Sequence, residues 1–239
     1  MEIRYFDCLP STSRTAAEAA RQGASHLYTV VAERQSAGRG RLSRSFFSPC
    51  GGLYFTTVLR TGLTPAQYGA VTPFAAVAVR RALSRCCGIN ASVKWVNDLL
   101  LDGKKLCGIL AESGTDLQGR PYILLGIGIN LGKTDFPPEL AEIATSVPCA
   151  DKDALLRAIL TELADVERAV LAGDWLQEYR EASAVIGRKV RIIEGERVRE
   201  GTAKDILSDG ALCVLLENGC TEELRGGEIS LRTTQVEQS

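Results

Sequence analysis

The stretch AERQSAGRGRLSRSFFSPCGG places Arg39, Arg41 and Arg44 among glycines and serines. Glycine lets a backbone come close to a ligand. A guanidinium offers a fixed fork of donors that suits carboxylate and phosphate oxygens. By itself this pattern fits an anion-binding loop and a solvated, charged surface loop equally well.

A second cluster of charges lies in KWVNDLLLDGKKLCG, where Lys94 and Lys105 supply positive charge. Asn97 and Asp98 carry oxygens that suit Mg²⁺ or can orient a nucleophile. The alternative is a charged hairpin on the surface. Trp95 and the apolar flanks favour a partly buried strand, in which a lysine needs a partner.

Several other chemistries are disfavoured. GRGRLS lacks the third glycine of a dinucleotide motif, and GINLGKT has three residues between Gly128 and Gly132 where a P-loop needs four. The chain has no C-x-x-C pair, and its only histidine, His26, is expected to be structural. We interpret the eight cysteines as small buried hydrophobes in a reducing compartment.

The composition is that of an ordinary globular protein. Of the 239 residues, 45% are hydrophobic and 24% are charged, and the net charge is −1. This balance favours neither a nucleic acid nor a membrane as partner. We find no apolar run of about 18 residues and no signal peptide, so we expect a cytoplasmic protein.

Local patterns predict an α+β fold with a mixed central sheet flanked by helices. Before residue 151 we expect helices at 11–23 and 64–88, the second kinked or split by Pro73, and strands at 27–32, 52–60, 91–95 and 122–132, with an Asp102–Gly103 hairpin. Two helices, from Asp151 and within 174–187, should follow, and then four short strands with glycine turns. We expect a catalytic domain at 1–186 and a small SH3-like barrel at 187–239.

A series of motifs resembles the biotin protein ligases over roughly residues 5–131. GRGRLSRSFFSPCGGLYFTTVLR matches that family's Gly-Arg-Gly-Arg loop, and KWVND (94–98), KLCGILAE (105–112) and GIGIN (126–130) follow in family order, after STS at 11–13. The resemblance implies the fold shared by biotin–lipoate ligases and class II aminoacyl-tRNA synthetases. Four residues depart from the pattern: Phe46 for Trp, Ser43 for Gly, Val96 for Pro and Ser13 for Asn. None removes a charge, so we expect an active enzyme.

The resemblance implies two half-reactions. MgATP activates biotin to biotinyl-5′-AMP, and a lysine of a biotin carboxyl carrier domain of a carboxylase then takes the biotin. ATP, Mg²⁺ and biotin act as substrates, and no tightly bound cofactor is expected.

The resemblance also implies residue roles. Lys105 would bridge the biotin carboxylate and the α-phosphate, and Asp98 would orient or deprotonate the acceptor amine, unless it only holds Lys94 or Arg39. The implied sets are as follows: catalytic Lys105, Arg39, Arg41 and Asp98; biotin-binding Ser11, Thr12, Ser13, Gln35, Gly38, Arg39, Arg41, Phe46, Lys105, Gly108 and Gly126; ATP-binding Arg41, Arg44, Lys94, Trp95, Asn97, Lys105, Gly128 and Asn130; Mg²⁺-binding Asn97 and Asp98.

Three alternatives stay open. A lipoate ligase or transferase would share the fold and the carrier-lysine chemistry, although the arginine loop and SPCGGLY favour biotin. A DNA-binding biotin repressor is disfavoured, because the core motifs begin close to Met1, and no nucleic-acid or membrane partner is expected. A non-catalytic SH3-like interaction module explains only the C-terminal part. The motifs fit a monomer or a homodimer.

Overall fold

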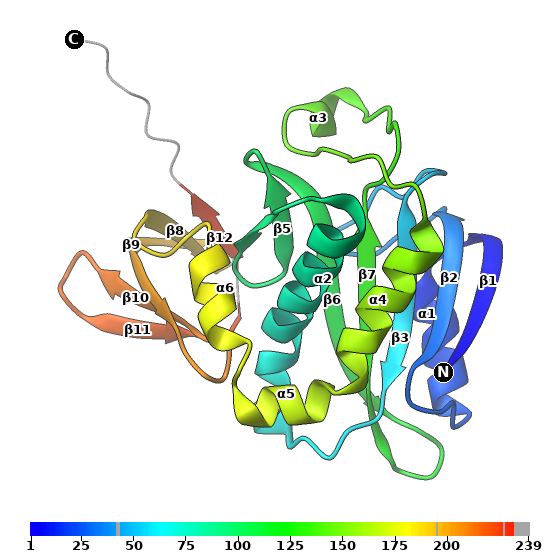
Figure 1. Ribbon diagram of the computed structural model, residues 1–239. Coiled ribbons are helices and arrows are strands. Elements are labelled where there is room, and N and C mark those ends of the chain that lie inside the picture. The colour runs from blue at the N-terminus through cyan, green and yellow to red at the C-terminus, as the bar shows by residue number, and fades with distance from the viewer. Residues whose placement is uncertain (42–43, 195, 227, 232–239) are drawn as a thin grey trace.

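The computed structural model describes residues 1–41, 44–194, 196–226 and 228–231. The departure at Ser43 and the last residues of the expected small domain lie outside this part. The described chain forms a seven-stranded mixed sheet and a separate five-stranded sheet, with helices on both faces of the larger one (Figure 1). This arrangement confirms the predicted α+β class.

The larger sheet has the strand order β1-β2-β3-β7-β6-β5-β4. Only the β1–β2 pair is parallel, and the other neighbours are antiparallel. The strands are β1 (Glu2–Leu9), β2 (Tyr28–Gln35), β3 (Leu53–Leu59), β4 (Ser92–Lys94), β5 (Asp98–Leu101), β6 (Lys104–Thr115) and β7 (Pro121–Ile129). Strand β3 is buried along its whole length, because it lies between β2 and β7 with helices on both faces of the sheet.

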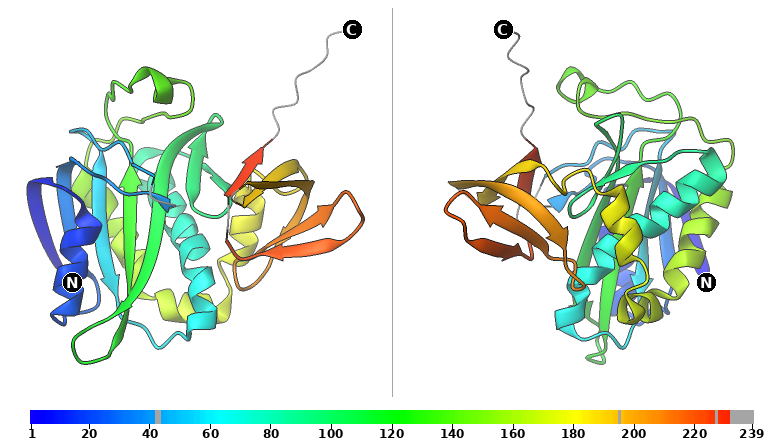
Figure 2. Two further views of the ribbon diagram at one scale, coloured as in Figure 1. Left: turned by 180° about the vertical axis from the view of Figure 1, so that it is seen from behind. Right: turned by 60° about the vertical axis from the view of Figure 1, so that its left-hand side comes forward.

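The helices divide between the two faces of this sheet (Figures 1 and 2). Helix α1 (Thr12–Arg21) packs on one face against β2, β3 and β7. The other face carries α2 (Val71–Cys87) together with α4 (Lys152–Ala164), α5 (Val166–Ala172) and α6 (Leu176–Ala182). A 3-10 turn η2 (Pro65–Ala70) precedes α2, and a one-turn helix α3 (Pro138–Ala141) follows β7.

The C-terminal part forms its own antiparallel sheet in the order β11-β10-β9-β8-β12. Its strands are β8 (Lys189–Glu194), β9 (Arg197–Ile206), β10 (Leu212–Leu216), β11 (Thr221–Leu224) and β12 (Glu228–Leu231). The expected turns connect β9 to β10 and β10 to β11, with Gly210 and Gly219 at φ 84° and 83°. The last of the four expected strands is divided into β11 and β12.

Several element boundaries differ from the sequence expectation. Strand β1 was not predicted, because it is an edge strand exposed on both faces and so lacks apolar alternation. The helix expected from Asp151 breaks at Asp165 into α4 and α5, and α6 ends at Ala182, after which Ser183 is extended. The helix expected at 64–88 is split, as one form of that prediction had it, into η2 and α2, and Pro73 lies in the first turn of α2, where its missing N–H breaks no helical bond.

The cysteine interpretation is correct only in part. All eight are free thiols, and Cys107 is fully buried, but Cys8, Cys50, Cys86 and Cys220 are exposed. His26 is structural as expected, since its Nδ1 accepts a hydrogen bond of 3.1 Å from the Arg60 backbone N–H. Among the described helices, none has both the length and the apolar character that crossing a bilayer requires.

Candidate active site

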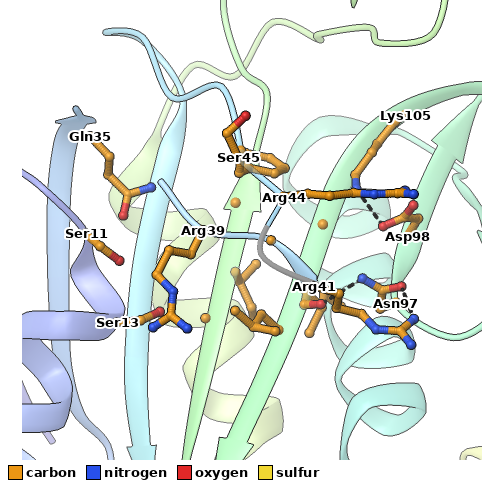
Figure 3. Close-up of a pocket in the computed structure, with 18 of the residues that line it drawn as sticks. Ser11, Ser13, Gln35, Arg39, Arg41, Arg44, Ser45, Asn97, Asp98 and Lys105 are labelled. Atoms are coloured by element: carbon orange, nitrogen blue, oxygen red, sulfur yellow. Dashed lines mark hydrogen bonds and ion pairs between the residues drawn. The ribbon is translucent and has the colours of Figure 1, made fainter. Parts of the chain in front are cut away.

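A cavity of about 170 Å³ opens on the face of the main sheet that carries α1. The arginine loop between β2 and β3 crosses it, so side chains from six segments of the chain meet there (Figure 3). All the predicted site residues line it except Gly38 and Asn130. The lining comprises Ser11, Thr12, Ser13, Gln35, Arg39, Gly40, Arg41, Arg44, Ser45, Phe46, Lys94, Trp95, Asn97, Asp98, Lys105, Gly108, Ile109, Leu110, Gly126, Ile127, Gly128 and Ile229.

The charged end of the cavity is built on the β5–β6 hairpin. Lys105 Nζ lies 2.7 Å from Asp98 Oδ1 and 5.6 Å from the centre of the Phe46 ring (Figure 3). Asp98 is opposite Gly108 in the strand register, which places its side chain on the cavity side. Asp98 thus pairs with Lys105, although the β4–β5 register sets Lys94 directly opposite Asp98.

Asn97 connects the arginine loop to the sheet. Its Oδ1 accepts a hydrogen bond of 3.1 Å from Arg41 Nη1, and its Nδ2 donates to the Ile109 carbonyl at 3.0 Å. The Ile109 N–H returns a bond of 2.9 Å to the Asn97 carbonyl. Asn97 is thus held from both sides, and it fixes the guanidinium of Arg41 at the charged end.

A second contact ties the loop to β6. Arg39 Nη2 lies 3.0 Å from Glu112 Oε1, and the two side chains are 53% and 33% exposed. Phe46 N–H also donates to the Gly38 carbonyl at 2.9 Å, which closes the loop on itself. Glu112 was not predicted as a site residue, although it stands in the KLCGILAE motif.

The opposite end of the cavity is lined mainly by neutral polar groups, and Arg39 is the charged side chain drawn beside them (Figure 3). Gln35 Oε1 accepts hydrogen bonds from the Thr12 N–H at 2.8 Å and the Thr12 hydroxyl at 3.1 Å. Gln35 Nε2 donates to Ser48 Oγ at 2.9 Å, and Ser13 Oγ lies 3.1 Å from Thr56 Oγ1. These contacts join the first turn of α1 to the end of β2, so the hydroxyls and the amide keep fixed directions.

Glycines form the floor between the two ends. A Cβ on Gly128 would lie 2.5 Å from Phe46 Cε1, and one on Gly108 would lie 3.0 Å from Phe46 Cε2. The Phe46 ring therefore rests directly on the backbone of β6 and β7. A Cβ on Gly38 would lie 2.5 Å from the Phe46 carbonyl oxygen, so Gly38 shapes the loop from outside the lining.

Asn130 lies behind the cavity. It is 4% exposed, and its Nδ2 donates to the carbonyls of Lys105 at 3.3 Å and Thr145 at 3.1 Å. Next to Lys105 in the same sheet, Cys107 is fully buried, which raises the pKa of its thiol well above the usual range. Cys107 is therefore an inert core residue and no nucleophile.

Sequence reasoning missed some of the lining. Leu110 shares the strand face of Gly108, so alternation on β6 could have found it, whereas Ile109 and Ile127 lie on the opposite face, in the core. Gly40 and Ser45 lie in the arginine loop itself. Ile229 comes from β12 of the C-terminal sheet, and no local signal connects it to this cavity.

The two predicted Mg²⁺ ligands each contact a cationic side chain. Asn97 Oδ1 is bonded to Arg41, and Asp98 Oδ1 is paired with Lys105. Their role as Mg²⁺ ligands stays a prediction. Within the described residues, no group of three or more His, Cys, Asp or Glu side chains could hold a metal ion.

Two family models match the chain. The Biotin/lipoate A/B protein ligase family matches residues 5–130, and the Biotin protein ligase C terminal domain matches residues 185–232. The similar solved structures include the biotin protein ligase from Aquifex aeolicus in complex with biotin and ATP. It is 26% identical and has a TM-score of 0.80, and the match covers 97% of this chain and 98% of that one.

Curated relatives show the same likeness. The bifunctional ligase/repressor BirA of Bacillus subtilis is 40% identical over 157 residues, which are 64% of this chain and 48% of the relative. The chain thus spans about half the length of that relative. The biotin–(acetyl-CoA-carboxylase) ligase of Mycobacterium tuberculosis is 31% identical over 228 residues, which are 88% of this chain and 83% of the relative.

Proposed function

This chain belongs to the biotin/lipoate A/B protein ligase family, and on that premise we propose that it is a biotin protein ligase. It activates biotin with MgATP to biotinyl-5′-AMP and transfers the biotin to a lysine of a biotin carboxyl carrier domain. The observation that carries this proposal is the division of one cavity into a mainly neutral polar end and a cationic end, with Lys105 at the cationic end beside Asp98.

The cationic end of the cavity reduces the repulsion between the two anionic substrates of the first step. A carboxylate must approach a triphosphate, and two unit charges about 4 Å apart repel by about 4 kcal/mol at an effective dielectric constant of 20. Arg41, Arg44 and Lys94 line the cavity near Lys105 and supply compensating charge. In this proposal Lys105 contacts both the carboxylate and the α-phosphate, so its ammonium stabilises the charge that develops between them.

The mainly neutral end suits the ring system of biotin. A ureido group carries two N–H donors and one carbonyl acceptor, and it binds best to oriented neutral partners. Thr12, Gln35 and Ser13 offer such partners, held by their own hydrogen bonds. Phe46 offers an apolar surface to the rest of the ligand.

The second step is an acyl transfer. The acceptor amine forms an amide bond to the biotin carbonyl carbon, the bond from that carbon to the phosphate oxygen breaks, and AMP leaves. The amine must lose a proton, and the Asp98 carboxylate is the base that lines the cavity beside Lys105. Mg²⁺ enters this scheme with ATP as part of the substrate, and Asn97 and Asp98 are the residues that would contact it.

The decisive experiment supplies ATP, Mg²⁺, biotin and a purified carrier domain and follows the carrier by intact mass. We expect a mass increase of one biotinyl group on the carrier, together with pyrophosphate release. A parallel reaction with equal biotin and lipoate tests the lipoate ligase alternative, since both substrates fall within the matched family. Exclusive lipoylation of the carrier, or no adduct with either acid, would contradict the proposal.

A further inference from the structure

One buried hydrogen bond joins the charged end of the cavity to the C-terminal sheet. The indole Nε1 of Trp95 donates to the carbonyl of Gly210 at 2.9 Å, and Trp95 is 4% exposed. Trp95 stands in the same short segment as Asn97 and Asp98, which hold Arg41 and Lys105. The position of this segment therefore depends on where the Gly210 turn lies.

The turn at Gly210 is packed too closely to move freely. Gly210 has φ 84°, and a Cβ there would lie 2.8 Å from the Gly69 carbonyl oxygen and 2.9 Å from Pro73 Cγ. The contact is reciprocal, because a Cβ on Gly69 would lie 2.8 Å from the Asp209 carbonyl oxygen. The backbone of the β9–β10 turn therefore packs directly against the backbone of η2, which precedes α2.

Other contacts hold the C-terminal sheet in the same position. Arg180 on α6 makes a two-pronged ion pair with Asp205, with N···O distances of 2.7 Å and 2.9 Å, and also bonds the Ile206 carbonyl. The same helix also contacts the Lys94–Asp98 segment, because the Tyr179 hydroxyl donates to the Val96 carbonyl at 3.4 Å. Ile229 of β12 is 2% exposed and forms part of the cavity wall.

We propose that Gly210 is a positioning residue for the adenylation step, acting through Trp95 on the Lys94–Asp98 segment. The inference rests on the proposed function and gives the C-terminal sheet a defined part in it. Displacing the turn would move Asn97 and Asp98, and with them the cations that face the phosphates. The polar end at Thr12 and Gln35 is held by its own hydrogen bonds, so biotin binding should change much less than adenylation.

The test compares two glycines of the same small sheet. Gly210→Ala introduces the close contacts with Gly69 and Pro73, whereas Gly219→Ala introduces none, since no atom lies within 4 Å of its Cβ. Both positions have nearly the same positive φ, 84° and 83°, so both variants carry the same strain in the turn. We expect Gly210→Ala to raise the KM for ATP or lower kcat for pyrophosphate release about tenfold or more, because small displacements of catalytic groups are costly.

Biotin affinity, measured by calorimetry without ATP, should stay within about twofold of the wild type in both variants. A twofold change in affinity corresponds to less than about 0.5 kcal/mol of binding free energy. A loss of biotin affinity in Gly210→Ala as large as its loss in adenylation would overturn the inference, because it would indicate general damage. Equal kinetics for Gly210→Ala and Gly219→Ala would overturn it as well.

Trp95→Phe is the second variant to measure. It tests the role of the Trp95–Gly210 hydrogen bond even if Gly210→Ala fails to fold. It removes the indole donor and keeps an aromatic ring, so an unchanged adenylation rate and KM for ATP would overturn the inference. In the double variant the two effects should be less than additive, because both act through one contact. A wild-type protein that releases no pyrophosphate from biotin and ATP would instead contradict the proposed function.

Discussion

Lys105 Nζ and Asp98 Oδ1 face each other across the β5–β6 hairpin at 2.7 Å, with side chains that are 34% and 21% exposed. The pair holds the ammonium at the cavity. A bound carboxylate and triphosphate would compete for Lys105 and release the carboxylate of Asp98. The two residues would then act in successive steps, Lys105 in adenylation and Asp98 in transfer.

Replacing Lys105 tests the first of these roles. We expect Lys105→Ala to lower adenylate formation by at least about 100-fold, the usual effect of losing one preorganised charge-stabilising donor. The measurement is pyrophosphate release with biotin and ATP at saturation. Release at a near-normal rate would remove Lys105 from the reacting centre.

Asp98→Asn tests the second role. We expect transfer from preformed biotinyl-5′-AMP to the carrier to fall about 100-fold, since general-base catalysis contributes at least that factor. Pyrophosphate release should fall much less, because the amide keeps its shape beside Lys105. Equal losses in the two half-reactions would show that Asp98 only positions Lys105.

The close packing of Phe46 on Gly108 and Gly128 predicts that a side chain at either glycine will disturb the ligand site. Gly128→Ala places a methyl 2.5 Å from Phe46 Cε1, and the ring must move off the backbone of β7. We expect biotin to bind about tenfold more weakly, or about 1.4 kcal/mol. Gly226→Ala is the control, because Gly226, like Gly128, has no positive φ and its Cβ meets nothing within 4 Å. Unchanged biotin affinity in Gly128→Ala would mean that the ligand does not use this floor.

Bound ligand should protect the arginine loop from proteolysis. Trypsin cuts after arginine, and we expect the free protein to be cut first between Arg39 and Arg44, more slowly with biotin, and slowest with a non-hydrolysable biotinyl-adenylate analogue. Identical rates with and without the saturating analogue would mean that the loop does not cover this intermediate.

Glu112→Gln should speed the cleavage of the free protein by no more than about fivefold, because an exposed pair such as Arg39–Glu112 contributes less than about 1 kcal/mol. The same change at Glu142, which is on the surface and 3.8 Å from Lys104, is the control. A loop cut equally fast in both variants would show that the ion pair does not hold it.

The carboxyl group of Asp116 should make the free energy of unfolding depend on pH. Burial raises the pKa of its carboxyl, but hydrogen bonds from the Arg120 N–H and guanidinium and from the Gln118 N–H outweigh burial and hold the pKa below its usual value. A carboxyl with a lowered folded pKa stabilises the protein above its unfolded pKa of about 3.9 and loses that contribution as the pH falls through the folded pKa.

Asp116→Asn should therefore unfold at a lower urea concentration than the wild type at pH 7 and should lose less stability between pH 5 and pH 3. Urea titrations across this range measure both effects. Parallel stability curves for the two proteins would contradict the prediction.

The sequence alone was sufficient for the local features. Asp102–Gly103, Asp209–Gly210 and Asn218–Gly219 all form turns, and the glycines have positive φ, because only a few residue types tolerate that conformation and their identity is visible in the chain. The arginine loop and the motif strands were likewise recognisable, since each depends on neighbouring residues. These features were enough to predict the fold class and most of the residues around the cavity.

Only the tertiary structure decided which of these residues meet. Side-chain packing paired Asp98 with Lys105, although Lys94 is opposite Asp98 in the β4–β5 register, and sheet order left β1 as an edge strand whose exposure hides any periodic signal. The packing of a second sheet brought Ile229 into the cavity and Gly210 against Trp95. Such contacts join residues more than 100 positions apart, and their distances depend on the summed packing of every layer between them, which no local pattern encodes.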